Sequence, residues 1–206
     1  MNGASVSPRL ATLDDVDAII ATVAAAFATD PAWAFIIGPD DRARQAFVRA
    51  LLIPRIHRAT AWVLDDCSAV AMWDRMACDE PIATPIATPT DDDQDTWWAT
   101  FRAEVGEEIW DRLQAYDSAL EAVGPSRPRW YLGVLATHPD VQGCGRATQV
   151  LEPGLAAAHT DGWDCWLETS NPANKSFYAG RGFIEATAVD IPGGPPTWWL
   201  HRPASR

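Results

Sequence analysis

The stretch Trp130–Ala147, WYLGVLATHPDVQGCGRA, decides the fold of this 206-residue chain. It begins with an apolar run rich in Trp, Tyr, Leu and Val, which predicts a buried strand. His138-Pro139-Asp140 ends that strand, Gly143 and Gly145 form a tight turn, and apolar residues at helical spacing follow. Glycine lets the backbone approach a phosphate, and the N–H groups of a first helical turn point towards it. The order strand, glycine turn, helix therefore predicts an anion site.

Two motifs resemble those of the GNAT superfamily of acyl-CoA-dependent N-acetyltransferases. Gln142-x-x-Gly145-x-Ala147 fits the Q/R-x-x-G-x-G/A signature of that family, and Leu135–Pro139 fits the strand before it. Residues 171–178, NPANKSFY, with Gly182-Phe183 behind them, resemble a second family element. Two motifs in the right order are more specific than either alone. Shorter stretches extend the likeness nearly end to end, to the puromycin-acetylating members of the superfamily.

This resemblance implies an α+β fold with a mixed central sheet of about seven strands, splayed between strands 4 and 5 and flanked by helices. We expect residues 1–206 to form a single acetyltransferase domain. Residues 79–96, rich in Pro and Asp, are expected to be a mobile loop. Residues 97–123 are expected to be one inserted helix that walls the acceptor site.

The rest of the chain gives more local predictions. Thr12-x-x-Asp15 is a capping-box variant that starts a helix, and residues 40–59 are a second helix. Residues 60–64 and 69–74 are an antiparallel hairpin. Residues 32–39 should be a loop. Pro153-Gly154 should bend or end the helix that follows the glycine turn.

The resemblance implies acetyl-CoA as the acyl donor. The free backbone groups of strand four, at Leu135, Ala136 and Thr137, would pair with the pantetheine arm. Arg146 could reach a phosphate, or be an ordinary surface residue. The other residues expected to bind the donor are Gln142, Gly143, Cys144, Gly145, Ala147, Thr148, Asn171 and Asn174.

Tyr178 matches the family's general acid. Full proton transfer from a phenol of pKa ~10 to a thiolate of pKa ~8.5 is uphill by ~2 kcal/mol, so Tyr178 would act mainly by donating a hydrogen bond. The sequence has no Glu between Arg129 and His138, where many relatives carry their base. Glu168 is the best remaining carboxylate, acting directly or through water. It could equally be a structural carboxylate at a strand end.

We expect Trp33, Phe35 and Trp73 to contact the acceptor. The 11 tryptophans are many for this length, and some should line a pocket for a flat or apolar molecule. An amine with a pKa near ~7.7 is partly neutral at pH 7 and needs no strong base, which favours it over a lysine-type amine at ~10.4.

The net charge of −12 argues against nucleic-acid binding. An acidic surface would attract a cationic acceptor, or serve solubility alone. The four cysteines show no metal or disulfide spacing, so we expect no metal. No apolar run approaches the ~20 residues of a membrane helix, and the N-terminus lacks the pattern of a secretory signal, so we expect a cytoplasmic protein without membrane contact. We also expect a monomer or a homodimer.

The expected activity is transfer of acetyl from acetyl-CoA to the primary amine of a small molecule, such as an antibiotic or a biosynthetic intermediate. One alternative is acetylation of a peptide or protein N-terminus. Others are a non-catalytic acyl-CoA-binding regulatory module and a protein that binds cationic drugs.

Overall fold

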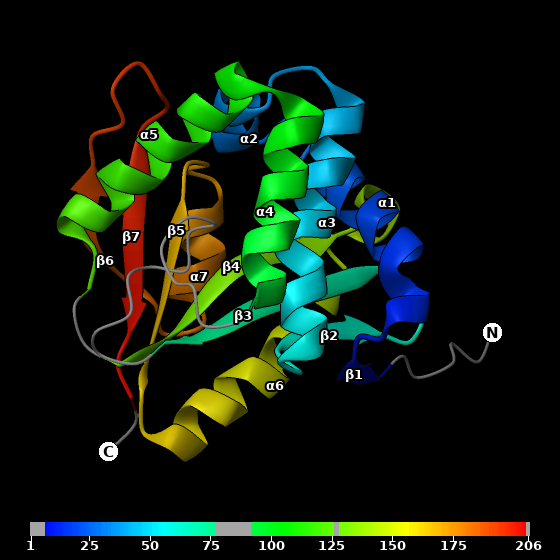
Figure 1. The fold of residues 1–206 in the computed structure, drawn as a ribbon. Helices are drawn as coiled ribbons and strands as arrows, with labels where there is room; N and C mark the ends of the chain where they lie inside the picture. Colours follow the sequence, from blue (N-terminus) through cyan, green and yellow to red (C-terminus); the bar gives the residue numbers. More distant parts are fainter. Residues whose placement is uncertain (1–6, 77–91, 126–127, 205–206) are drawn as a thin grey trace.

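The computed structural model describes residues 7–76, 92–125 and 128–204. Seven strands form one mixed sheet in the order β1-β2-β3-β4-β5-β7-β6, which confirms the fold class (Figure 1). In chain order the elements are β1 Pro8–Leu10, η1 Leu13–Asp15, α1 Val16–Ala26, α2 Pro31–Ile36, α3 Asp41–His57, β2 Ala61–Leu64, β3 Ala69–Met76, α4 Asp92–Val105, α5 Glu107–Val123, β4 Arg129–Thr137, η2 Pro139–Val141, α6 Arg146–Asp161, β5 Asp164–Thr169, α7 Asn174–Ala179, β6 Ile184–Val189 and β7 Thr197–Arg202.

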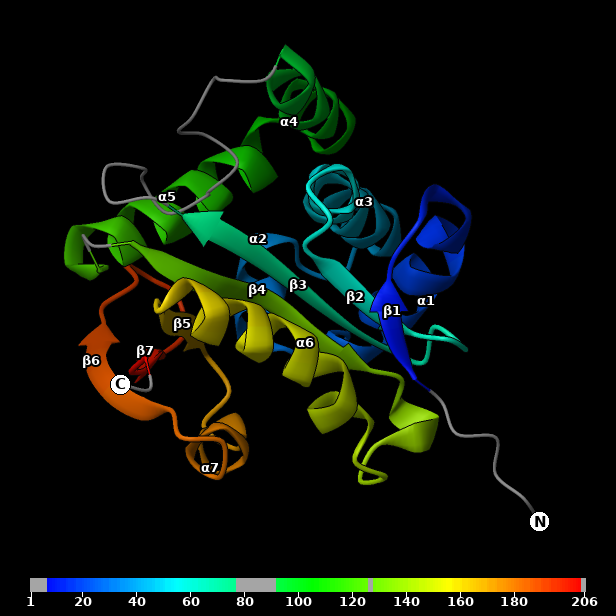
Figure 2. The ribbon, with the colours of Figure 1, turned by 90° about the horizontal axis from the view of Figure 1, so that it is seen from below.

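Helices cover both faces of the sheet, and each face has its own core. Helix α6 crosses one face, whereas α1, α3 and α4 stack on the other (Figure 2). Successive strand residues point to opposite faces, so Met72 joins the α1/α3 core and Trp73 joins the α6 core. The side on which a strand residue lies therefore decides whether it can reach a given cavity.

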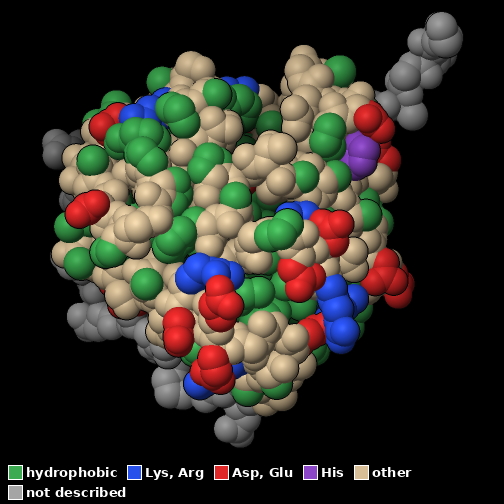
Figure 3. Space-filling view, turned by 90° about the horizontal axis from the view of Figure 1, so that it is seen from above, with side chains coloured by type: hydrophobic (Ala, Val, Ile, Leu, Met, Phe, Trp, Pro, Cys, Tyr) green, Lys and Arg blue, Asp and Glu red, His purple; other side chains and the backbone are tan. Residues whose placement is uncertain are grey.

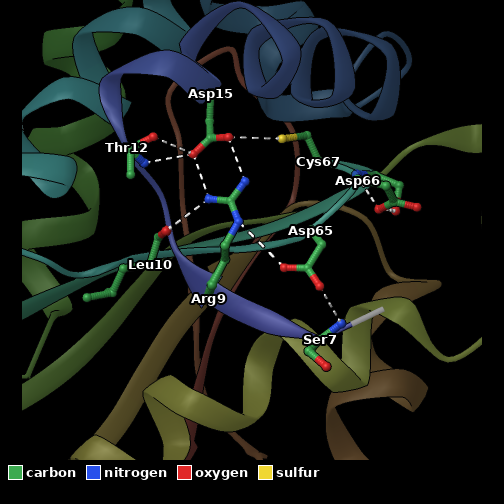
Figure 4. Close-up of polar contacts among 9 residues, drawn as sticks. Ser7, Arg9, Leu10, Thr12, Asp15, Asp65, Asp66 and Cys67 are labelled. Atoms are coloured by element: carbon green, nitrogen blue, oxygen red, sulfur yellow. Dashed lines mark hydrogen bonds and ion pairs between the residues drawn. The ribbon is translucent and has the colours of Figure 1, made fainter. Parts of the chain in front are cut away.

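The β1 end of the sheet is fixed by a polar cluster around Arg9 and Asp15 (Figure 4). The Arg9 guanidinium donates to both Asp15 oxygens at 2.7 Å. Asp15 also accepts the Thr12 N–H at 2.8 Å, which confirms the predicted capping box. The Cys67 thiol lies 3.5 Å from the same carboxylate and brings the β2–β3 turn to the start of α1. This turn also supplies Asp66, which forms an ion pair with Arg146 at the start of α6.

Three predicted elements differ from the structure. Residues 32–39 are not a plain loop, because Asp30 caps a short helix, α2, by accepting the N–H groups of Ala32 and Trp33. Residues 97–123 are not one helix. Gly106 separates α4 from α5. Its backbone, at φ +82° and ψ 172°, has a conformation that favours glycine.

The helix after the glycine turn is not shortened at Pro153-Gly154, because α6 runs unbroken from Arg146 to Asp161. A Cβ on Gly154 would lie 2.2 Å from the Trp73 Nε1, so this glycine allows the helix to pack closely on the indole. The expected loop over residues 79–96 lies mostly outside the described residues, and its last part, residues 92–96, belongs to α4.

Candidate active site

Strands β4 and β5 separate after a short parallel pairing. They pair only at Arg129–Asp164, Trp130–Cys165 and Tyr131–Trp166, whereas β4 pairs with β3 along its whole length. Just beyond the end of β4, the His138 N–H donates to the Ser68 carbonyl at 2.8 Å. In an antiparallel ladder such bonds alternate, so the backbone groups of Thr137 and Leu135 point away from β3, towards the gap. The expected splay is present, and on its edge the Thr137 carbonyl accepts a hydrogen bond from the Gln142 side-chain amide at 3.1 Å.

The glycine turn leaves the start of α6 open. Gly143 and Gly145 have φ of +77° and +79°, and Gly145 occupies the cap position, where it has no side chain to accept the first N–H groups of α6. A cavity of about 430 Å³ lies against these amides. It is lined by Leu135, Thr137, Gln142, Gly143, Gly145, Arg146, Ala147, Thr148, Asn174, Phe177, Tyr178 and Arg181.

Most of the predicted donor residues therefore meet in one cavity, which we call the donor cavity, but three do not line it. Ala136 is buried in the α1/α3 core. The Cys144 side chain is exposed, with its sulfur 3.7 Å from the Gln142 carbonyl. Asn171 accepts the Ala173 N–H at 3.0 Å and stabilises the turn before α7. Ala136 and Asn171 thus make folding contacts, whereas the Cys144 side chain faces solvent.

Two arginines line the donor cavity, and they differ in their partners. Arg146 is paired with Asp66 and also donates to Ser68, so a carboxylate of the β2–β3 turn already balances its charge. Arg181 stacks on the Phe177 ring at 3.5 Å and donates to the Phe177 carbonyl and the Thr148 hydroxyl. It makes no ion pair with a carboxylate among the described residues. Arg181 is not among the donor-cavity residues predicted from the sequence. Its position three residues after Tyr178, next to the end of α7, is a signal that could have indicated it.

Tyr178 lies where the donor cavity meets a second cavity. Its ring packs edge-on against Phe177 and Phe183, and only 8% of the residue is exposed. Burial is the main cause that raises the pKa of Tyr178, and the carboxylate of Glu168 adds to it. The phenol therefore stays protonated near neutral pH and is available as a hydrogen-bond donor.

The second cavity, which we call the acceptor cavity, has a volume of about 110 Å³. Its walls come from the α1–α2 region, α3, α5, β4 and β5, and it shares Leu135, Asn174 and Tyr178 with the donor cavity. All three tyrosines of the chain, at positions 116, 131 and 178, line it. A molecule held here would meet a thioester held in the donor cavity at the Tyr178 ring.

Glu168 projects from β5 into the acceptor cavity. The Tyr131 hydroxyl lies 2.9 and 2.8 Å from its two oxygens. Burial raises the pKa of Glu168 to about 7, although the hydrogen bond from Tyr131 acts in the opposite direction. A carboxylate with a pKa near neutrality suits a general base.

The predicted acceptor residues have different positions. Trp33 lines the acceptor cavity. Phe35 packs against the α1/α3 core and does not line it. Trp73 is fully buried on the opposite face of the sheet, against Gly154 of α6, and does not line the acceptor cavity. The sequence alone does not tell which face of β3 carries Trp73.

Within the described part of the chain, no helix is long and apolar enough to cross a membrane. The same residues contain no group of three or more His, Cys, Asp or Glu side chains placed to hold a metal ion.

No protein-family model matches the chain. Among solved structures it is similar to a Corynebacterium glutamicum protein described as histone acetyltransferase HPA2 and related acetyltransferase, with 22% identity over 98% of each chain and a TM-score of 0.67. It is also similar to a mutant agmatine N-acetyltransferase, with 12% identity over 96% of this chain and 98% of that chain and a TM-score of 0.66. A third is the PaiA N-acetyltransferase of Thermoplasma acidophilum in complex with coenzyme A, with 11% identity over 97% and 99% of the chains and a TM-score of 0.59. These likenesses show that the chain has the GNAT acyltransferase fold.

Proposed function

We propose that this protein is an acetyl-CoA-dependent N-acetyltransferase that acts on the primary amine of a small molecule. The observation that carries the proposal is the meeting of two cavities at Tyr178, one with open backbone amides and one with a carboxylate of near-neutral pKa. An acyl transfer between two substrates needs such a shared boundary, because the reacting atoms must come within about 3–3.5 Å of each other.

The donor cavity fits acetyl-CoA in three respects. The uncapped start of α6 offers N–H groups to a pyrophosphate. Arg181 adds a positive charge. The Thr137 hydroxyl is buried without a hydrogen-bond partner among the described residues, so a polar group of the pantetheine arm could satisfy it. Bound there, acetyl-CoA would supply an acetyl thioester, and the backbone N–H groups of β4 that point towards the gap would polarise its carbonyl.

Glu168 and Tyr178 then have different roles, one as the proton acceptor and the other as a hydrogen-bond donor. Glu168 accepts the proton of the attacking amine, directly or through water, and its pKa of about 7 keeps a large share of it ionised near neutral pH. Tyr178 donates a hydrogen bond to the departing sulfur, which stabilises the thiolate as the carbon–sulfur bond breaks.

The walls of the acceptor cavity favour a small molecule over a peptide. Helices α2 and α5 contact each other, and Trp33, Ile36 and Leu113 from these two helices line the cavity, which narrows the space for a polypeptide. Antibiotics and biosynthetic intermediates with a primary amine, including puromycin-like molecules, both belong to this class. The agmatine N-acetyltransferase of similar fold acts on a small amine of the same kind.

The test is CoA release from acetyl-CoA, followed with a thiol reagent, across a panel of small amines and peptides. The proposal predicts release that depends on a small primary amine, with the product heavier by one acetyl group. Binding of acetyl-CoA without CoA release for any amine would support a regulatory binding module instead. Release only with peptides would support acetylation of peptide N-termini.

A further inference from the structure

Three carboxyl groups from three separate elements line the acceptor cavity. Asp30 lies just before α2, Asp117 lies on α5 and Glu168 lies on β5. Asp30 and Glu168 have partners: one Asp30 oxygen caps α2, and both Glu168 oxygens accept the Tyr131 hydroxyl. Among the described carboxyl groups of this cavity, Asp117 is the one with a fully buried oxygen that has no hydrogen-bond partner.

Asp117 is buried without a protein partner for one of its oxygens. The residue is 7% exposed, and its Oδ2 has no hydrogen-bond partner among the described residues. Leaving a buried carboxyl oxygen unpaired is costly, and such groups usually indicate a ligand, a water or a functional role. Burial raises the pKa of Asp117 well above its ordinary value, and the nearby Glu168 carboxylate adds to the shift.

The described residues of the cavity lining include no cation that is free of a carboxylate partner. Arg55 is the one Lys or Arg among the described residues of the cavity wall. Its guanidinium forms a buried ion pair with Asp74 and donates to the Leu51 carbonyl at 2.6 Å. On the face shown in Figure 3, acidic and basic side chains are interspersed rather than gathered by sign.

Apolar side chains provide the surface between the carboxyl groups. Trp33, Phe47, Leu51 and Leu113 line the same cavity, and Leu113 lies one helical turn before Asp117 on α5. A hydrocarbon linker can pack against these residues while polar ends reach the carboxyl groups.

Building on the proposed function, we propose that the acceptor is a small diamine whose reacting amine lies at Glu168 and Tyr178 and whose second ammonium group binds the unpaired carboxyl of Asp117. A dication relieves the repulsion among the three carboxyls, and it gives the Asp117 Oδ2 the donor that the protein does not provide. A monoamine of the same length leaves that oxygen without a partner. The site should therefore prefer the diamine.

The test compares linear diamines, from 1,3-diaminopropane to 1,6-diaminohexane, with the monoamines propylamine to hexylamine. We expect kcat/KM for the best diamine to exceed that of its matched monoamine by roughly 30-fold, as for a buried charge pair. In Asp117→Asn this ratio should fall towards one, mainly through a higher KM. Asp111→Asn, an exposed change on the same helix, is the control and should keep the wild-type ratio.

Calorimetric titration of the wild-type protein with each diamine and monoamine gives a readout that does not need turnover. Equal kcat/KM for diamines and monoamines, or an unchanged ratio in Asp117→Asn, would overturn the diamine proposal and leave the N-acetyltransferase proposal in place. Diamine binding that is lost in Asp117→Asn, without CoA release, would overturn the acetyltransferase proposal and support the dication site.

Discussion

The Tyr131 hydroxyl bridges both carboxylate oxygens of Glu168, at 2.9 and 2.8 Å. The two residues come from the two strands that separate, β4 and β5, and they lie at the point where the parallel pairing ends. This hydrogen bond stabilises the ionised form of Glu168, whereas burial destabilises it. The balance between them sets the pH at which Glu168 can accept a proton.

Tyr131→Phe should move the acidic limb of the pH–rate profile upwards. Loss of the hydrogen bond removes a contribution that lowers the pKa of Glu168, so this pKa should rise above its value of about 7. Activity depends on the ionised base, which is present above the pKa and is lost as pH falls through it. The check is kcat/KM against pH for both proteins; an acidic limb that stays in place or moves down would contradict the assignment.

Glu168→Gln should lower kcat by roughly 10²- to 10⁴-fold, because the amide cannot accept the proton of the amine. The limb near pH 7 should disappear with the group that causes it. Acetyl-CoA affinity, measured by calorimetry, should change little because Glu168 does not line the donor cavity. A variant that keeps its rate and its pH limb would make Glu168 a structural carboxylate.

Arg181→Met should weaken acetyl-CoA binding more than Arg146→Met does. The Arg181 charge has no carboxylate partner among the described residues, whereas that of Arg146 is balanced by Asp66. We expect Kd to rise about tenfold for Arg181→Met, which corresponds to about 1.4 kcal/mol of binding free energy. The rise for Arg146→Met should be smaller. Kd measured at two salt concentrations checks the electrostatic origin, since the difference should shrink at high salt. The reverse order of the two variants would contradict this reading.

Gly154→Ala should destabilise the fold by about 1–3 kcal/mol, because the new Cβ would lie 2.2 Å from the Trp73 indole. Gly180→Ala is the matched control: its backbone is helical, and the nearest atoms to the added Cβ lie at 3.6 Å. Urea unfolding of both variants measures the difference. Equal midpoints would show that α6 does not rely on close contact at Gly154.

Much of the architecture could be predicted because the signals were local. The apolar run before His138 and the glycines at 143 and 145 carry their own strand and turn preferences, and the structure has both. The capping box at Thr12 is likewise local. Two errors also had local signals: Asp30-Pro31 is a helix start, and Gly106 is a helix break.

Other features depend on contacts between distant residues, and the sequence pattern did not contain them. Trp73 falls on the α6 face of its strand, next to a shift in the β3–β4 register. The partner of Arg146 is 80 residues away in the chain. The unpaired Asp117 looks like an ordinary polar helix residue until α5 is packed over the acceptor cavity.

The central claim is that Tyr178 assists departure of the thiol at the meeting point of the two cavities, and Tyr178→Phe tests it most directly. The change removes one hydroxyl and keeps the ring that packs on Phe177 and Phe183. We predict a fall in kcat of about 10²-fold or more with acetyl-CoA affinity within about twofold of wild type. A variant that turns over at the wild-type rate would contradict the account.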